Sequence, residues 1–177
     1  MRKIVFLFLI WMVAPGVLPL SAQQPPSAVE VKVDDLKATP YGISITLRAS
    51  RSDELLHMLI GVSEGEAIAR ALSHRTPPRP MTHDLITVIL GRTGWRVQKV
   101  LIRGVSDSTF LADLVLEKNG ETEIIDARPS DAMAIAVRSD AKIFVNPEVF
   151  EIERRQERQE RDQEREATPP EGEGLHL

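Results

Sequence analysis

The stretch IIDARPSDAMAIAVR, residues 124–138, decides the fold because it changes secondary structure within one short turn. Its start, IIDA, is typical of a buried strand, and PSDAMAIAVR predicts a helix with Pro129 in the first turn. Asp126, Arg128 and Asp131 lie in or beside the turn between these two apolar elements. Two carboxylates and a guanidinium at such a place need either a structural or a functional explanation.

The structural explanation begins with Asp131, which lies in the first turn of the predicted helix. An aspartate there accepts hydrogen bonds from free N–H groups and meets the positive end of the helix dipole, a gain of about 0.5–1 kcal/mol. Arg128 lies between a buried strand and a buried helix, so we expect it to pair with a carboxylate, and Asp126 is the candidate partner. Ion pairs of this kind often serve structure alone, and the residues by themselves favour this explanation.

The functional explanation uses the same three residues. Asp126 and Asp131 flank a sharp strand-to-helix turn, where two converging carboxylates could hold Mg²⁺ or Mn²⁺ through oxygen ligands. Such an ion could activate water and neutralise a phosphate. Arg128 could bind the same phosphate through two parallel hydrogen bonds.

A second segment, RPMTHD at residues 79–84, has the same layout as RPSD at residues 128–131. In each, Arg-Pro precedes a predicted helix whose first turn contains an aspartate. Thr82 is the expected N-cap of this second helix, and His83 is suited to proton transfer near neutral pH. The structural alternative is that Asp84 caps the helix and His83 is a surface residue.

The remaining sequence predicts a single compact α+β domain with a mostly antiparallel or mixed sheet and about three helices. Alternating or short apolar runs predict strands at 29–38, 43–49, 54–61, 95–105, 108–118, 121–127 and 142–146. Helical patterns cover 63–74, 82–94 and 129–140. Ser63 and Glu66 have capping-box spacing, Asn119–Gly120 is a hairpin signal, and RTPPRP at 75–80 is a stiff connector.

The two ends of the chain differ from this domain in composition. Residues 1–22 combine an Arg-Lys start, an apolar run and small residues, the pattern of a secretory signal peptide. An uncleaved N-terminal anchor is the alternative; after cleavage we expect no membrane span. Residues 23–28 are a linker, 29–150 the domain, and 151–177 a charged low-complexity tail that favours a solvated single helix. We therefore expect an exported protein, periplasmic or extracellular.

Composition excludes several kinds of site. The 177 residues contain no cysteine, so disulfides, thiolate metal sites and a cysteine nucleophile are absent. The formal net charge of −4 gives no general basic excess for nucleic-acid binding. A local basic cleft built from Arg79, Arg96, Arg103 and Arg128 is still compatible with these numbers.

Five motifs, in this order, give the chain a resemblance to a known family. RPMTHDLI, GWRVQKVLI, DSTFLADLVL, DARPSDAMAIAVR and KIFVN together resemble the bifunctional nuclease domain family. The resemblance runs from about residue 29 to residue 150. It implies a compact α+β domain with oligomeric relatives and an activity on both DNA and RNA.

The resemblance directs the polar residues of both turns towards phosphate chemistry. Among the positions that match the family's motifs, side-chain chemistry suggests His83, Asp84, Asp126 and Asp131 as catalytic residues, with Asp126 and Asp131 also as ligands of Mg²⁺ or Mn²⁺. The same reasoning suggests Arg79, Arg128 and Ser130, which also match the family's motifs, as substrate-binding residues. Nucleic acid and further copies of the chain are the implied partners. The alternative is a non-catalytic oligomeric module that binds a small anionic ligand or a protein partner in the cell envelope.

Overall fold

The computed structural model describes residues 27–107 and 109–167, which form one α+β domain followed by a long helix. Seven strands make a single mixed sheet in the order β3-β2-β1-β7-β4-β5-β6. The strands are β1 (Val29–Thr39), β2 (Gly42–Ala49), β3 (Leu55–Ile60), β4 (Arg96–Ser106), β5 (Thr109–Lys118), β6 (Glu121–Ala127) and β7 (Lys142–Val145). Only the β4–β7 pair is parallel among the strand pairs of these residues. The predicted fold class is confirmed.

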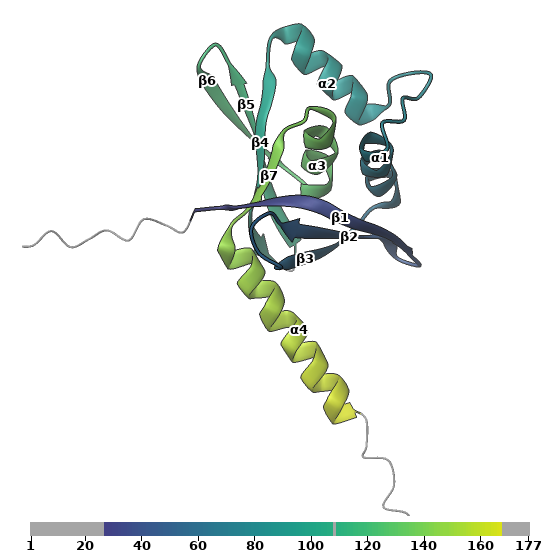
Figure 1. Cartoon of the computed structure of the whole chain (residues 1–177), viewed down its shortest axis with the longest axis vertical. Coiled ribbons are helices and arrows are strands. Elements are labelled where there is room, and N and C mark those ends of the chain that lie inside the picture. Colours follow the sequence, from purple (N-terminus) through teal and green to yellow (C-terminus); the bar gives the residue numbers. More distant parts are fainter. Residues whose placement is uncertain (1–26, 108, 168–177) are drawn as a thin grey trace, which may run out of the picture.

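Three helices pack together on one side of this sheet (Figure 1): α1 (Val62–Leu72), α2 (Thr82–Thr93) and α3 (Pro129–Arg138). The central one is α3, which contacts both other helices and strands β4, β5 and β7. Its small residues Ala132, Ala134 and Ala136 are fully buried, as is Met133. A helix that is apolar on nearly all sides has to be enclosed, and this enclosure fixes where its polar first turn lies.

Local chemistry explains the elements around α3. Asn119 and Gly120 both have positive φ, 52° and 86°, the conformation of the two-residue turn that the sequence predicts between β5 and β6. Gly94 ends α2 in the left-handed region with φ 81°. Gly65 lets α1 approach β2 closely, since a Cβ there would lie 2.5 Å from Cγ1 of Ile43.

Two predicted helix starts were wrong. Gly61, with no side-chain hydrogen bond, is the N-cap of α1, so Ser63 and Glu66 do not form the expected capping box. Met81 rather than Thr82 is the N-cap of α2, and its N–H donates to Oδ2 of Asp84 at 2.9 Å. Both corrections move the helix start by one or two residues, where competing cap residues make a sequence ambiguous.

The charged C-terminal helix α4 (Pro147–Ala167) begins inside the domain and extends away from it (Figure 1). Val149, Phe150 and Glu153 in its first turns are buried, and Oε1 of Glu153 accepts from the backbone N–H of His57 on β3. Predicted signal peptide 1–22, most of linker 23–28 and the last ten residues of the tail lie outside the described residues. None of the helices described is both long and apolar enough to cross a membrane.

Candidate functional site

The polar turn before α3 meets α1 rather than the strand that precedes it. Arg128 is the N-cap of α3; its Nε donates to Oδ2 of Asp131 at 2.7 Å. Its Nη2 lies 3.4 Å from Oε1 of Glu64 in the first turn of α1. The expected pairing of Arg128 with Asp126 was wrong, because the helical first turn places Asp131 three residues on, within direct reach of the guanidinium.

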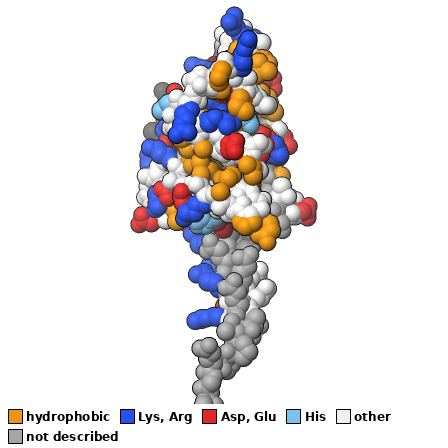
Figure 2. Space-filling view, turned by 90° about the vertical axis from the view of Figure 1, so that its right-hand side faces the viewer, with side chains coloured by type: hydrophobic (Ala, Val, Ile, Leu, Met, Phe, Trp, Pro, Cys, Tyr) orange, Lys and Arg blue, Asp and Glu red, His pale blue; other side chains and the backbone are white. Residues whose placement is uncertain are grey.

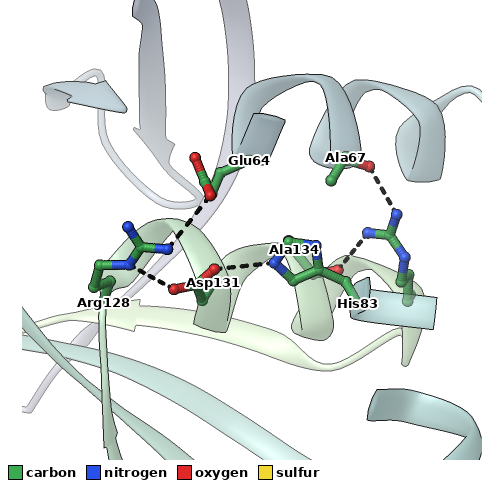
Figure 3. A network of polar contacts seen from close by, with 7 residues as sticks. Glu64, Ala67, His83, Arg128, Asp131 and Ala134 are labelled. Atoms are coloured by element: carbon green, nitrogen blue, oxygen red, sulfur yellow. Dashed lines mark hydrogen bonds and ion pairs between the residues drawn. The ribbon is translucent and has the colours of Figure 1, made fainter. Parts of the chain in front are cut away.

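His83 joins this cluster from the first turn of α2. Its Nε2 lies 3.0 Å from Oδ1 of Asp131, and the residue is only 8% exposed. Asp131 thus accepts from Arg128 with one oxygen and contacts the imidazole with the other. Figure 3 shows the resulting line of side chains from Glu64 through Arg128 and Asp131 to His83, drawn from all three helices.

A second set of polar contacts involves the next residue of α2. Asp84 accepts from Nε of Arg138, whose Nη1 and Nη2 donate to the backbone oxygens of Ala134 at 2.8 Å and Ala67 at 3.1 Å. Arg138 and Asp131 are seven positions apart, so they lie on one face of α3 two turns from each other. The consecutive pair His83–Asp84 therefore holds α2 against α3 at both ends of that face.

Both helix-start aspartates are held in the ionised form. Burial raises the pKa of Asp131, but the hydrogen bonds from Arg128 and His83 outweigh it, and the pKa lies below the usual range of an aspartate. Burial likewise raises the pKa of Asp84, and the hydrogen bonds from Arg138 and the Met81 N–H outweigh it, leaving that pKa lowered too. Each carboxylate is therefore available at neutral pH to orient a cationic or imidazole partner.

Asp126 lies apart from this cluster. It is on edge strand β6, its side chain is 78% exposed, and its Oδ1 accepts from Nη2 of Arg103 at 2.6 Å. Neighbouring residues of a strand face opposite ways, and Ala127 packs against the core, so Asp126 faces away from the helices. Nε of the same Arg103 donates to Asp113 at 2.8 Å.

The predicted Mg²⁺ or Mn²⁺ site therefore does not fit the arrangement of its two ligands. Asp126 and Asp131 do not converge, and both oxygens of Asp131 already have partners. Across residues 27–107 and 109–167, no three His, Asp or Glu side chains are grouped so that they could hold a metal ion.

Ser130 and Arg128 border a cleft of about 300 Å³ beside this cluster. Gly61 at the start of α1 and Thr109 and Phe110 at the start of β5 form other walls. Ser130 is buried, whereas the Arg128 side chain is 69% exposed. Two helix starts without a side-chain cap meet here, which favours the binding of an anion.

The structure places Arg79 on the exposed connector between α1 and α2. It has no hydrogen bond or ion pair with a described residue, and it does not line the cleft beside Ser130. Of the residues predicted for the site, His83, Asp84, Arg128, Ser130 and Asp131 come together around α3. Arg79 and Asp126 do not join them.

Two residues of the site were missed from the sequence, Glu64 and Arg138. Glu64 lies 64 positions before its partner Arg128, and Asp84 lies 54 positions before Arg138, so no local pattern links them. One signal was available for Arg138: it is the charged residue that ends an otherwise apolar helix, on the same face as Asp131.

Comparison with known proteins shows which family this chain belongs to. The bifunctional nuclease domain matches residues 45–158, and the chain belongs to the bifunctional nuclease domain family. The matched region contains the α1–α3 cluster and also the first half of α4.

Two relatives of this chain differ in identity and in the share of their length that is matched. An uncharacterised protein of Mycobacterium tuberculosis strain H37Rv is 36% identical over 122 residues, which cover 69% of this chain and 71% of the relative. Bifunctional nuclease 1 of Oryza sativa subsp. japonica is 29% identical over 135 residues, which cover 75% of this chain but 36% of the plant protein.

Proposed function

We propose that this chain is a nuclease that hydrolyses phosphodiester bonds in DNA and RNA. Family membership and the name of the rice relative support this assignment. The observation that carries it is the junction of a histidine, an aspartate and an exposed arginine beside a cleft at two helix starts. These groups supply proton transfer, orientation of the proton-transfer group and phosphate binding in one place.

Arg128 and the first turn of α3 are the proposed phosphate-binding groups. Most of the Arg128 side chain is exposed, so its guanidinium can rotate from Glu64 and Asp131 towards a phosphate in the adjacent cleft. The first N–H groups of α3 lack partners within the helix and point out of its start. Ser130, which lines the same cleft, is the proposed third contact.

His83 is the proposed proton-transfer residue, and Asp131 positions it. The contact between Nε2 and Oδ1 holds the ring in one orientation, as a general base requires. Nδ1 of His83 has no hydrogen bond to a described residue. It is the nitrogen left to accept a proton from water or to give one to the leaving oxygen. Asp84 has a structural role in this proposal, because its contact with Arg138 holds the turn of α2 that carries His83.

A dependence on Mg²⁺ or Mn²⁺ remains a prediction from the sequence. Because Asp126 and Asp131 do not form a shared site, no step of the proposed reaction uses a metal ion. Assays in either ion and in chelator test this point directly.

The test is cleavage of labelled single- and double-stranded DNA and RNA by the purified protein, with Mg²⁺, Mn²⁺ or chelator. Arg128→Ala and Asp131→Asn should each reduce the rate at least tenfold, while Arg51→Ala, at an exposed arginine of the β2–β3 turn, should not change it. Circular dichroism confirms that each variant is folded. If the parent cleaves none of the four substrates under any of these conditions, the proposed function is wrong.

We also propose that the nuclease is exported and acts in the periplasm or outside the cell as a homo-oligomer. The signal-peptide pattern of residues 1–22 supports the first part, and the oligomeric state implied by the family resemblance supports the second. Fractionation with N-terminal sequencing tests export, and light scattering on the purified protein tests assembly. A full-length cytoplasmic monomer would contradict both parts.

A further inference from the structure

A second and larger cleft, of about 500 Å³, lies at the C-terminal end of α3, where α1 and α2 also line it. We call it the connector cleft, because residues 73–81, which join α1 to α2, form one of its walls. Arg70, His74 and Arg75 line it from α1 and the connector, and Val88 lines it from α2. The Asp84–Arg138 pair also lines it, so the residue after His83 belongs to its wall.

The connector cleft is lined by charges of both signs, and of its three arginines Arg70 pairs with Glu66 and Arg138 with Asp84. Three of the four arginines expected from the sequence to form a basic cleft, Arg96, Arg103 and Arg128, are instead engaged by carboxylates. Arg75, which lines the connector cleft, and Arg79, on the same connector, are exposed and have no ion pair with a described residue. Exposed His74 also lines the cleft, and so does Asp140, a carboxylate with no ion pair to a described residue.

The connector cleft also has apolar walls. Pro77, Pro80 and Val88 line it, and the prolines restrict the connector backbone. Figure 2 views the molecule from the side on which the connector lies, and basic and apolar side chains are mixed there with a few acidic ones. Cations beside apolar walls suit a ligand that carries both a phosphate and a flat, weakly polar group.

Size decides which nucleic acid could enter. A volume of about 500 Å³ is typical of a site for one small molecule and accommodates a single nucleotide. A base-paired duplex, whose bases are stacked inside, cannot place a nucleotide there without opening.

We propose that the connector cleft binds one nucleotide of a single-stranded nucleic acid, with Arg75 and Arg79 on the flanking phosphates. This inference rests on the proposed function for its substrate, and it adds that single strands bind in preference to duplexes. The wall shared through Asp84 places the bound strand next to the turn that carries His83.

The experiment measures binding separately from cleavage. Fluorescence anisotropy in chelator follows a labelled 12-nucleotide oligothymidylate, a labelled 12-nucleotide oligouridylate and a 12-base-pair duplex. The test protein carries Arg75→Ala with Arg79→Ala. The matched control carries Arg51→Ala with Arg155→Ala, which removes the same charge at exposed arginines of the β2–β3 turn and of α4.

We expect the connector variant to bind single strands at least tenfold more weakly and the control to stay within about twofold of the parent. Loss of two phosphate contacts should also reduce the slope of log affinity against log salt by about 1.4. Equal affinities of the connector and control variants, equal affinities for duplex and single strand, or no binding by the parent would each overturn the inference. Connector-dependent binding by a parent that does not cleave would instead reject the nuclease and keep the site.

Discussion

Replacing Arg138 by methionine tests the interpretation that this buried arginine holds the three helices together. The substitution keeps much of the side-chain volume and removes three hydrogen bonds: those to Asp84, to the Ala134 oxygen and to the Ala67 oxygen. The Arg138 side chain is 9% exposed and that of Asp84 24%. The pair is thus largely shielded from water, and its loss leaves a carboxylate with fewer partners.

The expected loss of stability follows from these contacts. Breaking a buried ion pair from one side costs about 3–5 kcal/mol. Asp84 keeps its hydrogen bond from the Met81 N–H and is reached by some water, so the low end applies. We expect the free energy of unfolding to fall by about 3 kcal/mol. Lysine at the same position reaches fewer of the three acceptors and should lose about half as much.

Urea unfolding followed by circular dichroism at pH 7 measures these losses. Arg92→Met is the matched control, because Arg92 is an exposed arginine in the last turn of α2, and it should change stability by less than about 0.5 kcal/mol. A double-mutant cycle with Asp84→Asn isolates the Arg138–Asp84 interaction. If Arg138→Met loses less than about 1 kcal/mol, the arginine does not hold the helices as described.

Further predictions concern pH, packing and the tail. The folded-state pKa values of Asp84 and Asp131 lie below the usual value, so their stabilisation is full above about pH 4 and is lost as the pH falls through the lowered values. Urea midpoints from pH 6 to pH 3 should therefore fall, and less steeply in Asp84→Asn; equal slopes would contradict this. Gly65→Ala should destabilise by about 1–3 kcal/mol because the new Cβ overlaps Ile43, whereas Gly91→Ala, with open space, should not destabilise. Glu153→Ala should loosen the start of α4 on β3, seen as faster hydrogen exchange at the His57 N–H; unchanged exchange would show that the contact is not needed.

The fold was largely predictable because its signals are local. The Asn119–Gly120 turn, the alternation in β1 and β2, and Pro129 at the start of α3 each act within a few residues. The sheet order was not predictable in the same way. β7 inserts between β1 and β4, and this follows from how the enclosed α3 returns the chain to the sheet rather than from any pattern in KIFV itself.

The site was predictable only in part, because local patterns reveal its helix starts but not the contacts between distant elements. The polar residues at the two helix starts were identified from their spacing, and the structure brings His83 to Asp131 and Asp84 to Arg138. Asp126 was grouped with Asp131 because the two are close in sequence, yet the alternation of a strand directs it to the other face. Contacts between distant helices, such as that of Glu64 with Arg128, depend on packing that single-sequence patterns do not carry.

In the proposed reaction His83, held by Asp131, transfers the proton in phosphodiester cleavage. The most direct measurement is the single-turnover cleavage rate of a labelled single-stranded RNA and DNA by the parent, His83→Gln and His57→Gln, each confirmed as folded. His57 is the control because it is exposed on β3 and bonded to Thr46. We expect at least a hundredfold lower rate for His83→Gln and a parent-like rate for His57→Gln. Cleavage by His83→Gln at the parent rate would contradict the proton-transfer role of His83.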